Sequence, residues 1–194
     1  MRPVVREEIL DFMTYTEKRS AVRPAILEAK RLRRVGIGPH LMLLFENHQT
    51  IWYQIQEMMR VERIVREKDI QHEIKTYNDL IGVDGGVGAC LLIGIIDPDD
   101  RALKLGEWMG LLPTLYLELA DGTKIAPQWD ERQVGDDRLS SVQYLQFPLG
   151  GQVPVAAGCD FGDPAVCFRV ELSAETREAL TADLAEASLA STPR

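Results

Sequence analysis

The sequence predicts an α+β fold, in which a largely antiparallel sheet of about five or six strands is covered by an N-terminal helical layer and a helical hairpin. Apolar residues recur at helical spacing before Gly82, whereas several later segments alternate apolar and polar residues. Most of these later segments follow one another without an intervening helix, which favours antiparallel pairing. We expect a single globular domain over residues 1–190 and a frayed tail over 191–194.

The amino-terminal segment is predicted to form two short helices with a cationic surface. Pro24 fits only as a kink or as the first residue of the second helix. Residues 1–34 contain nine Lys and Arg against five Asp and Glu, while the whole chain contains 22 against 30 and has a formal net charge of -8. Because a non-specific nucleic-acid binder needs an excess of cations to neutralise phosphates, we expect no nucleic-acid partner.

A buried strand and a helical hairpin are predicted next. Gly36 ends the helical segment, and the continuous apolar run 40–45 has the length of a buried strand. Asn47 is a suitable cap for a helix that runs to about Arg66, and Asp69 is a suitable cap for a second helix that ends at Gly82. The two helices form the hairpin.

The second half of the chain supplies most of the predicted strands. Asp97-Pro98 caps a helix that ends near Gly110, and Ser173 opens a final helix. Asp121-Gly122 supplies the positive-φ pair of a tight hairpin. The expected strands occupy the apolar or alternating runs 89–96, 115–119, 123–126, 141–147 and 166–172.

Acidic residues of the helical hairpin are the main candidates for a functional site. Glu62 falls on the apolar face of the first helix, and Glu73 lies at the edge of the apolar stripe of the second, where an unpaired carboxylate is costly. We favour an ion network in which both pair with cationic side chains of the first segment, namely Arg19, Arg23, Lys30, Arg33 or Arg34. Glu57 and Arg60, on more polar faces, are further catalytic candidates.

Metal and anion sites are the alternatives for these residues. Glu62, His72 and Glu73 are the candidate metal ligands, although the chain lacks the repeated Glu-x-x-His pattern of di-iron carboxylate bundles. Arg33 and Arg34, beside a glycine-containing turn, are the candidates for binding a carboxylate or phosphate. The sequence identifies no cofactor. The glycine-rich run 82–88 follows a helix and precedes a strand, the reverse of what a phosphate-binding loop requires.

The cysteines and the hydropathy pattern bear on the compartment. For Cys90, Cys159 and Cys167 we favour reduced, packed thiols, with a redox pair of Cys159 and Cys167 as the alternative. Charged residues interrupt the amino terminus before a secretory core, and no run of about 18 apolar residues occurs. We therefore expect a cytoplasmic protein with no membrane partner.

The sequence also resembles an uncharacterised bacterial family, domain of unknown function family 3501, over nearly the whole chain. The resemblance rests on Lys30, Arg33-Arg34-Val35-Gly36, Phe45-Glu46-Asn47, Gln54 to Arg60, Glu62, Glu73, Tyr77-Asn78, Leu80-Ile81, Asp97-Pro98, Arg101, Ser141-Val142, Leu145 and Phe147. It implies no assigned fold or activity, only a loose association with rubrerythrin-like peroxide-handling proteins and iron–sulfur oxidoreductases. Gln143 and the stretch 161–164 depart from the family pattern, which has histidines there, and this weakens any histidine-based metal site.

Two functional readings follow. The first is a non-catalytic accessory or binding protein, associated with redox or peroxide-handling systems, whose sheet and helical hairpin offer a surface to a protein partner or to a second copy in a dimer. It rests on the absence of a nucleophile motif, a phosphate loop and a complete metal motif. The second is a small metal-dependent or redox enzyme that uses the carboxylates of the hairpin.

Overall fold

The computed structural model describes residues 1–82 and 85–190 and confirms the α+β class. The α-helices are α1 (Phe12–Arg31), α2 (His48–Glu62), α3 (Glu67–Asn78), α4 (Pro98–Glu107) and α5 (Ala174–Ala190). The strands are β1 (Arg34–Ile37), β2 (Leu41–Glu46), β3 (Val87–Ile93), β4 (Leu115–Glu118), β5 (Lys124–Ile125), β6 (Val142–Phe147), β7 (Ala156–Cys159) and β8 (Phe168–Glu171). All pairings between these strands are antiparallel, as predicted. The expected frayed tail lies outside the described residues.

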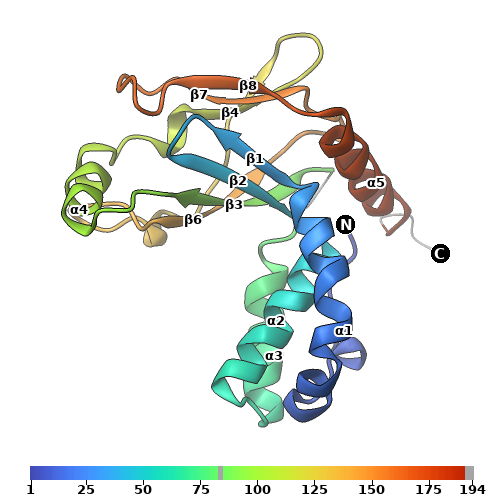
Figure 1. Cartoon of the computed structure of the whole chain (residues 1–194). Coiled ribbons are helices and arrows are strands. Elements are labelled where there is room, and N and C mark those ends of the chain that lie inside the picture. Colours follow the sequence, from blue (N-terminus) through green and yellow to red (C-terminus); the bar gives the residue numbers. More distant parts are fainter. Residues whose placement is uncertain (83–84, 191–194) are drawn as a thin grey trace.

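The strands form two four-stranded sheets instead of one larger sheet. Sheet A has the order β1-β2-β3-β6, and sheet B has the order β5-β4-β7-β8. The sheets are stacked (Figure 1), and their facing side chains belong to one hydrophobic core that includes Leu43 and Leu91 of sheet A and Leu117 and Ala157 of sheet B. All four of these side chains are fully buried.

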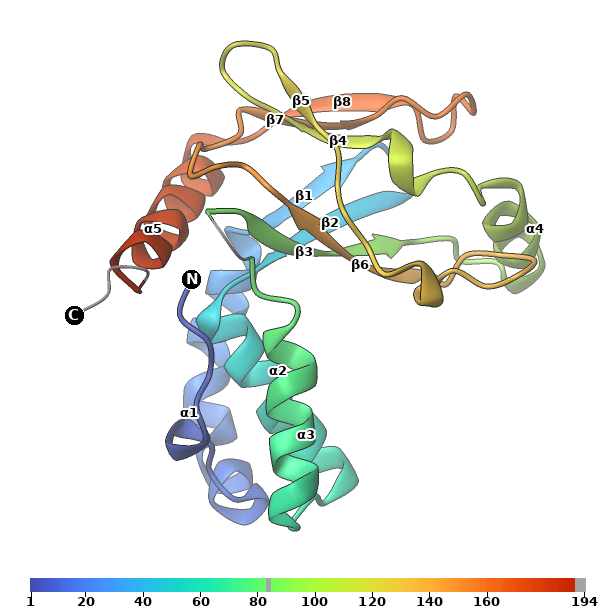
Figure 2. The same cartoon turned by 180° about the vertical axis from the view of Figure 1, so that it is seen from behind.

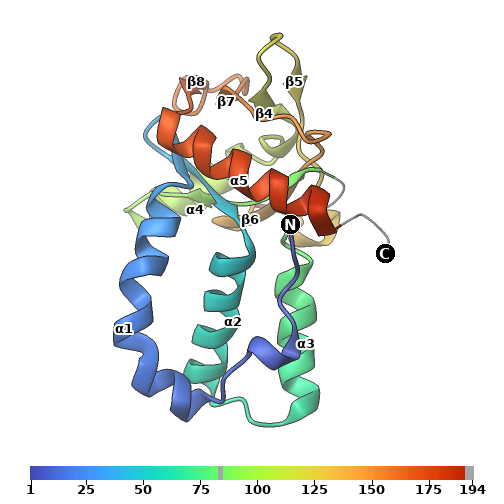
Figure 3. The same cartoon turned by 90° about the vertical axis from the view of Figure 1, so that its right-hand side faces the viewer.

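Helices α1, α2 and α3 extend away from one end of sheet A (Figures 1 and 2), so the helical layer stands beside the sheet instead of lying across its face. In Figure 3 the three helices lie side by side with α2 in the middle, and α2 contacts both neighbours. Helix α5 lies where the sheets meet this layer (Figure 1). One face of sheet A is thereby left without a covering layer in the described part of the chain.

Helix α1 is one continuous helix, so the prediction of two short helices is wrong. The Asp11 side chain caps it by accepting hydrogen bonds from two backbone amides of the first turn, both at 3.0 Å. Pro24 lies inside the helix and removes one backbone hydrogen bond. Tyr15 and Ile26, on either side of the proline, are buried in a cluster with Tyr53 of α2. This packing holds both halves of α1 against α2 and keeps the helix continuous.

Two strands were not predicted, and several boundaries differ. β1 and β7 lie in segments that the sequence pattern left as turns, and β1 joins β2 through Gly38, whose φ is 68°. Helix α2 ends four residues before the predicted Arg66, because Arg63 adopts the left-handed conformation. Helix α3 begins at Glu67, so Asp69 lies in its first turn and is not its cap.

The remaining local predictions are mostly confirmed. The Asp97 side chain caps α4 with Pro98 in the first turn, but the helix ends at Glu107, before the predicted Gly110. The hairpin between β4 and β5 forms where expected. Gly122 has a φ of 84°, and Asp121 is not in the left-handed region. The Asp121 side chain instead accepts a hydrogen bond from a backbone amide two residues later, as in an Asx turn.

Candidate functional site

Glu57, and not Glu62 or Glu73, forms the ion network with the amino-terminal helix. Its Oε1 accepts hydrogen bonds from Arg19 Nε and the Tyr15 hydroxyl, both at 2.7 Å, and its Oε2 lies 3.3 Å from Arg60 Nη2. Burial alone would raise the pKa of Glu57, but the hydrogen bonds from Arg19, Tyr15 and Arg60 lower it to about 2. Glu57 and Arg60 thus join α1 to α2 in a closed structural cluster.

Glu62 and Glu73 make no ion pair with any described residue, so their predicted pairing with arginines is wrong. Glu62 is the last residue of α2 and is exposed, while Glu73 is half-buried. Burial, followed by the negative charge of Glu62, raises the pKa of Glu73. His72 is exposed. Within residues 1–82 and 85–190, no group of three His, Cys, Asp or Glu side chains is placed to hold a metal ion, and Glu62, His72 and Glu73 do not form one.

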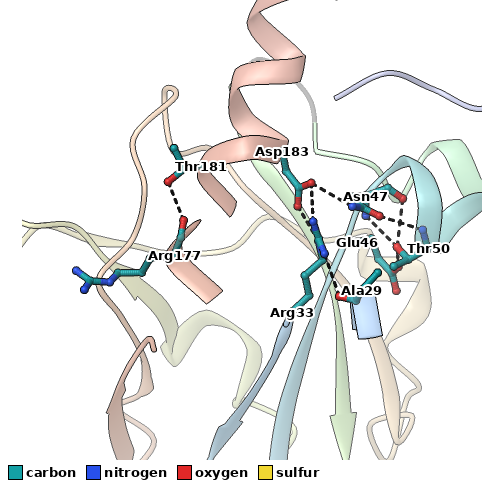
Figure 4. A network of polar contacts seen from close by, with 8 residues as sticks. All are labelled: Ala29, Arg33, Glu46, Asn47, Thr50, Arg177, Thr181 and Asp183. Carbon is teal, nitrogen blue, oxygen red and sulfur yellow. Dashed lines mark hydrogen bonds and ion pairs between the residues drawn. The ribbon is translucent and has the colours of Figure 1, made fainter. Parts of the chain in front are cut away.

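Arg33 is buried in a polar network that fixes α5 to the rest of the chain (Figure 4). Its Nε and Nη2 donate to the two carboxylate oxygens of Asp183 at 2.7 and 2.8 Å, and its Nη1 donates to the Ala29 carbonyl at 2.9 Å. Asn47 Nδ2 also donates to Asp183, at 3.1 Å. All donors of this guanidinium that face Asp183 are therefore used, and Arg33 is not free to bind an anion. Arg34 is exposed and remains a candidate.

Glu46 lies at the edge of the same network, at the end of β2 and just before α2. Only 9% of Glu46 is exposed, and its Oε2 accepts a short hydrogen bond of 2.5 Å from the Thr50 hydroxyl. Burial raises the pKa of Glu46, and the Thr50 hydrogen bond and the positive charges of Lys30 and Arg33 offset only part of this effect. Glu46 is thus a buried carboxyl group without a direct ion-pair partner among the described residues.

Strand register places Glu46 on the outer face of sheet A, the face turned away from sheet B. Because paired residues of an antiparallel sheet share a face, the pairings define three rows across that face. The rows are Glu46, Gly88 and Gln146; then Arg34, Leu44, Cys90 and Tyr144; then Gly36, Met42, Leu92 and Val142. We call these residues the outer face of sheet A.

The outer face of sheet A is apolar where an uncovered sheet face is usually polar. An antiparallel sheet with one solvated face normally alternates apolar and polar residues along each strand. Here Met42 and Val142 are each 37% exposed and Tyr144 is 42% exposed, while Leu44 and Cys90, closer to the helices, are buried. This arrangement gives the molecule an exposed apolar surface on regular secondary structure.

Titratable groups connect this face to the helical hairpin. Burial and then the charge of Glu46 raise the pKa of the Cys90 thiol to about 12, so the thiol stays protonated and unreactive. Burial raises the pKa of Tyr144, with smaller effects of Cys90, Tyr77 and Glu46. These mutual effects place Tyr77 of α3 close to the outer face. Lys30 of α1 lies 5.2 Å from the ring centre of Tyr53 and offsets part of the Glu46 charge.

Amide side chains of the hairpin hold the amino-terminal segment. Gln56, fully buried, accepts from the backbone amide of Leu10 at 2.7 Å and donates to its carbonyl at 3.1 Å. Asn78 does the same for Val4, at 2.9 Å in both directions. Trp52 Nε1 donates to a third backbone carbonyl of this segment at 2.9 Å. These side chains have structural roles that sequence periodicity did not reveal.

Cysteines and the departing positions supply no ligand or redox pair. All three cysteines are free; Cys90 and Cys159 are buried as predicted, whereas Cys167 is exposed. Gln143 is fully buried and donates to the Ser140 carbonyl at 3.0 Å, so it faces the core and not a metal. Asp163, in the other departing stretch, accepts a hydrogen bond from Trp108 Nε1 at 2.9 Å.

Comparisons with known proteins identify a family but no activity. The family model described as "Protein of unknown function (DUF3501)" matches residues 3–184. The chain belongs to this family. A solved DUF3501-like structure, described as a novel protein of unknown function from Burkholderia pseudomallei K96243, is 26% identical with a TM-score of 0.84 and covers 94% of this chain and 99% of that chain. No curated protein matches.

The family assignment and the structure agree on where to look for function. Several residues that carry the resemblance to the DUF3501 family have structural partners, including Arg33, Gln56, Glu57 and Asn78. Glu46 also belongs to that pattern, yet it has no ion-pair partner among the described residues and lies on the outer face of sheet A. None of the described helices is both long and apolar enough to cross a membrane.

Proposed function

We propose that this DUF3501 protein is a non-catalytic binding or accessory protein whose interface is the outer face of sheet A. The proposal is carried by the exposed apolar residues Met42, Val142 and Tyr144, which lie together on a sheet face that no described element covers. Exposed apolar clusters on regular elements mark interaction surfaces in soluble proteins.

A second copy of the chain is the partner that the charges favour. The formal net charge of -8 opposes self-association over most of the surface. On the outer face of sheet A, however, Arg34 is the one exposed charged residue, because Glu46 is buried and the other members are apolar or uncharged. Two identical copies of this face can therefore approach without opposing carboxylates.

Sedimentation velocity tests self-association. We expect the protein to sediment as a dimer of about twice the 21.8 kDa chain mass at micromolar concentration. Val142→Lys places a charge on the outer face and is expected to give a monomer. Ile96→Lys is the matched control, because Ile96 is 99% exposed outside the sheets and its replacement leaves the dimer intact. A monomeric wild-type protein, or equal dimerisation of both variants, contradicts self-association through this face.

The same variants test the accessory role, including the association with redox or peroxide-handling systems that the family resemblance implies. The wild-type chain and both variants serve as baits for capture from native lysate, followed by mass spectrometry. A stoichiometric protein retained by the Ile96→Lys bait and lost from the Val142→Lys bait supports an accessory role. Recovery of the same proteins by all three baits contradicts it.

The alternative, an enzyme that uses carboxylates of the hairpin, has less support from the geometry. Glu57 and Arg60 are paired with each other, and Glu57 also pairs with Arg19. Glu62 is exposed, and the pair it forms with Glu73 lacks a third ligand among the described residues. A binding function therefore accounts for more of the arrangement than a catalytic one.

A further inference from the structure

A cleft of about 610 Å³ opens between the end of α3, the segment 128–133 and strand β6. Figure 2 shows the chain between β5 and β6 passing alongside β6 at the edge of sheet A. Trp129 and Tyr144 contribute aromatic rings to the lining, and Leu80 and Leu145 contribute further apolar surface. The volume falls within the range of about 300–1,000 Å³ that is usual for small-molecule sites.

Hydrogen bonds fix the walls of this cleft in place. Gln128 and Gln146 exchange two backbone hydrogen bonds, at 2.7 and 2.8 Å. The Gln133 side chain donates to the Tyr144 carbonyl at 2.9 Å and accepts from its amide at 2.7 Å. Gln146 Nε2 donates to the Asp79 carbonyl at 3.0 Å, which ties the end of α3 to the same strand. The cleft is therefore preformed by contacts between its own walls.

The charges around the cleft favour a cation. Its charged lining residues are Asp79, Asp130 and Arg132, which sum to one net negative charge. Asp79 pairs with Lys75 at 3.0 Å in an exposed ion pair, and Arg132 is 90% exposed and pairs with Asp130. Exposed ion pairs of this kind are weak, so both carboxylates can face a bound cation, while an anion would meet a guanidinium that is already engaged.

We propose that this cleft binds a small organic cation, an alkylated amine or quaternary ammonium group, against the rings of Trp129 and Tyr144. Aromatic rings attract such cations through their quadrupoles, and Trp is the strongest of them. Asp79 and Asp130 add long-range attraction at the rim. The proposal stands apart from self-association, although Tyr144 belongs to both the cleft and the outer face of sheet A.

Isothermal titration calorimetry with two probes of the same shape tests the charge requirement. Choline carries the quaternary ammonium group, and 3,3-dimethylbutan-1-ol replaces its nitrogen with carbon. We expect choline to bind with at least a fivefold lower dissociation constant than the neutral alcohol. Equal affinities, or no detectable choline binding at about 50 mM, overturn the proposal, because a preformed aromatic site holds a cation at least weakly.

Three variants locate the binding site. Trp129→Leu keeps an apolar side chain without a ring and is expected to weaken choline binding by fivefold to tenfold, whereas Trp129→Phe retains part of the affinity. Asp130→Asn removes a charge but keeps the oxygen that accepts from the Arg132 amide at 3.0 Å, and is expected to weaken binding at least twofold. Asp99→Asn, on exposed α4, is the matched control.

Each outcome of the variant series counts for or against the cleft. Far-UV circular dichroism first confirms that every variant is folded. Wild-type affinity in both Trp129→Leu and Asp130→Asn overturns the proposal, as does equal weakening by Asp130→Asn and Asp99→Asn. If Trp129→Leu fails to fold, Trp129→Phe and Asp130→Asn carry the test, since both preserve the shape of the original side chain more closely. The Val142→Lys variant keeps its choline affinity if the cleft and the self-association are independent.

Discussion

The buried pair of Arg33 and Asp183 makes a quantitative prediction for Asp183→Ala. The two side chains are 9% and 7% exposed, and the carboxylate accepts from Arg33 at 2.7 and 2.8 Å and from Asn47 at 3.1 Å. The substitution leaves the guanidinium buried with only the Ala29 carbonyl as a partner. Breaking one half of a buried ion pair costs about 3–5 kcal/mol, which corresponds to roughly 6–20 °C in Tm for a chain of this size.

Urea unfolding, followed by far-UV circular dichroism, measures this loss. Glu175→Ala is the matched control, because Glu175 is also on α5 and pairs with Arg31 at 3.0 Å, but the two side chains are 63% and 56% exposed. The control is expected to change the free energy of unfolding by less than about 0.5 kcal/mol. Replacing both members, as Arg33→Met with Asp183→Leu, removes the unpaired charge and is expected to recover most of the loss. A loss within about 1 kcal/mol for Asp183→Ala would refute the reasoning.

Two further substitutions test the helix contacts and the sheet. Glu57→Gln is expected to cost about 2 kcal/mol at pH 7. The pKa of Glu57 is lowered to about 2 from 4.5, so its contribution to stability is present above pH 4.5 and is lost as the pH falls towards 2. The slope of unfolding free energy against pH in that interval should be shallower in the variant, and identical slopes would contradict the ion network. Gly88→Ala would place a Cβ 1.8 Å from the Leu80 carbonyl oxygen and is expected to cost at least about 3 kcal/mol in urea unfolding. Gly36→Ala, on the same face with nothing within 4 Å, is its control, and an equal effect of both would contradict the predicted clash.

The helices and most strands were predictable because each has a strong local signal. The periodicity of 51–59 and 70–81 marked α2 and α3, and Asp97-Pro98 marked the start of α4. Strand β7 was missed because Ala156–Cys159 lacks the branched residues typical of strands. A Cβ at Gly158 would lie 2.3 Å from the Tyr116 ring, so the small residue is required by a contact that no local pattern contains. The division into two sheets followed from this missing strand.

The candidate site was predicted only in part, because periodicity gives the face of a helix and not its neighbour. Glu57 was assigned to a polar face, yet that face meets α1 and pairs with Arg19. Glu62 was assigned to the apolar face, but α2 ends there and leaves it exposed. The apolar run 40–45 correctly indicated a central strand, but it could not show that Met42 would be exposed on an uncovered face.

The attachment of residues 4 and 10 to the hairpin has a consequence for how the sequence can diverge. Gln56 and Asn78 grip only main-chain N–H and C=O groups, which every residue except proline offers alike. The tether is therefore blind to the side chains it holds, and substitutions along the tethered stretch can accumulate without detaching it. A change at either amide anchor, by contrast, would leave two main-chain groups stranded at once.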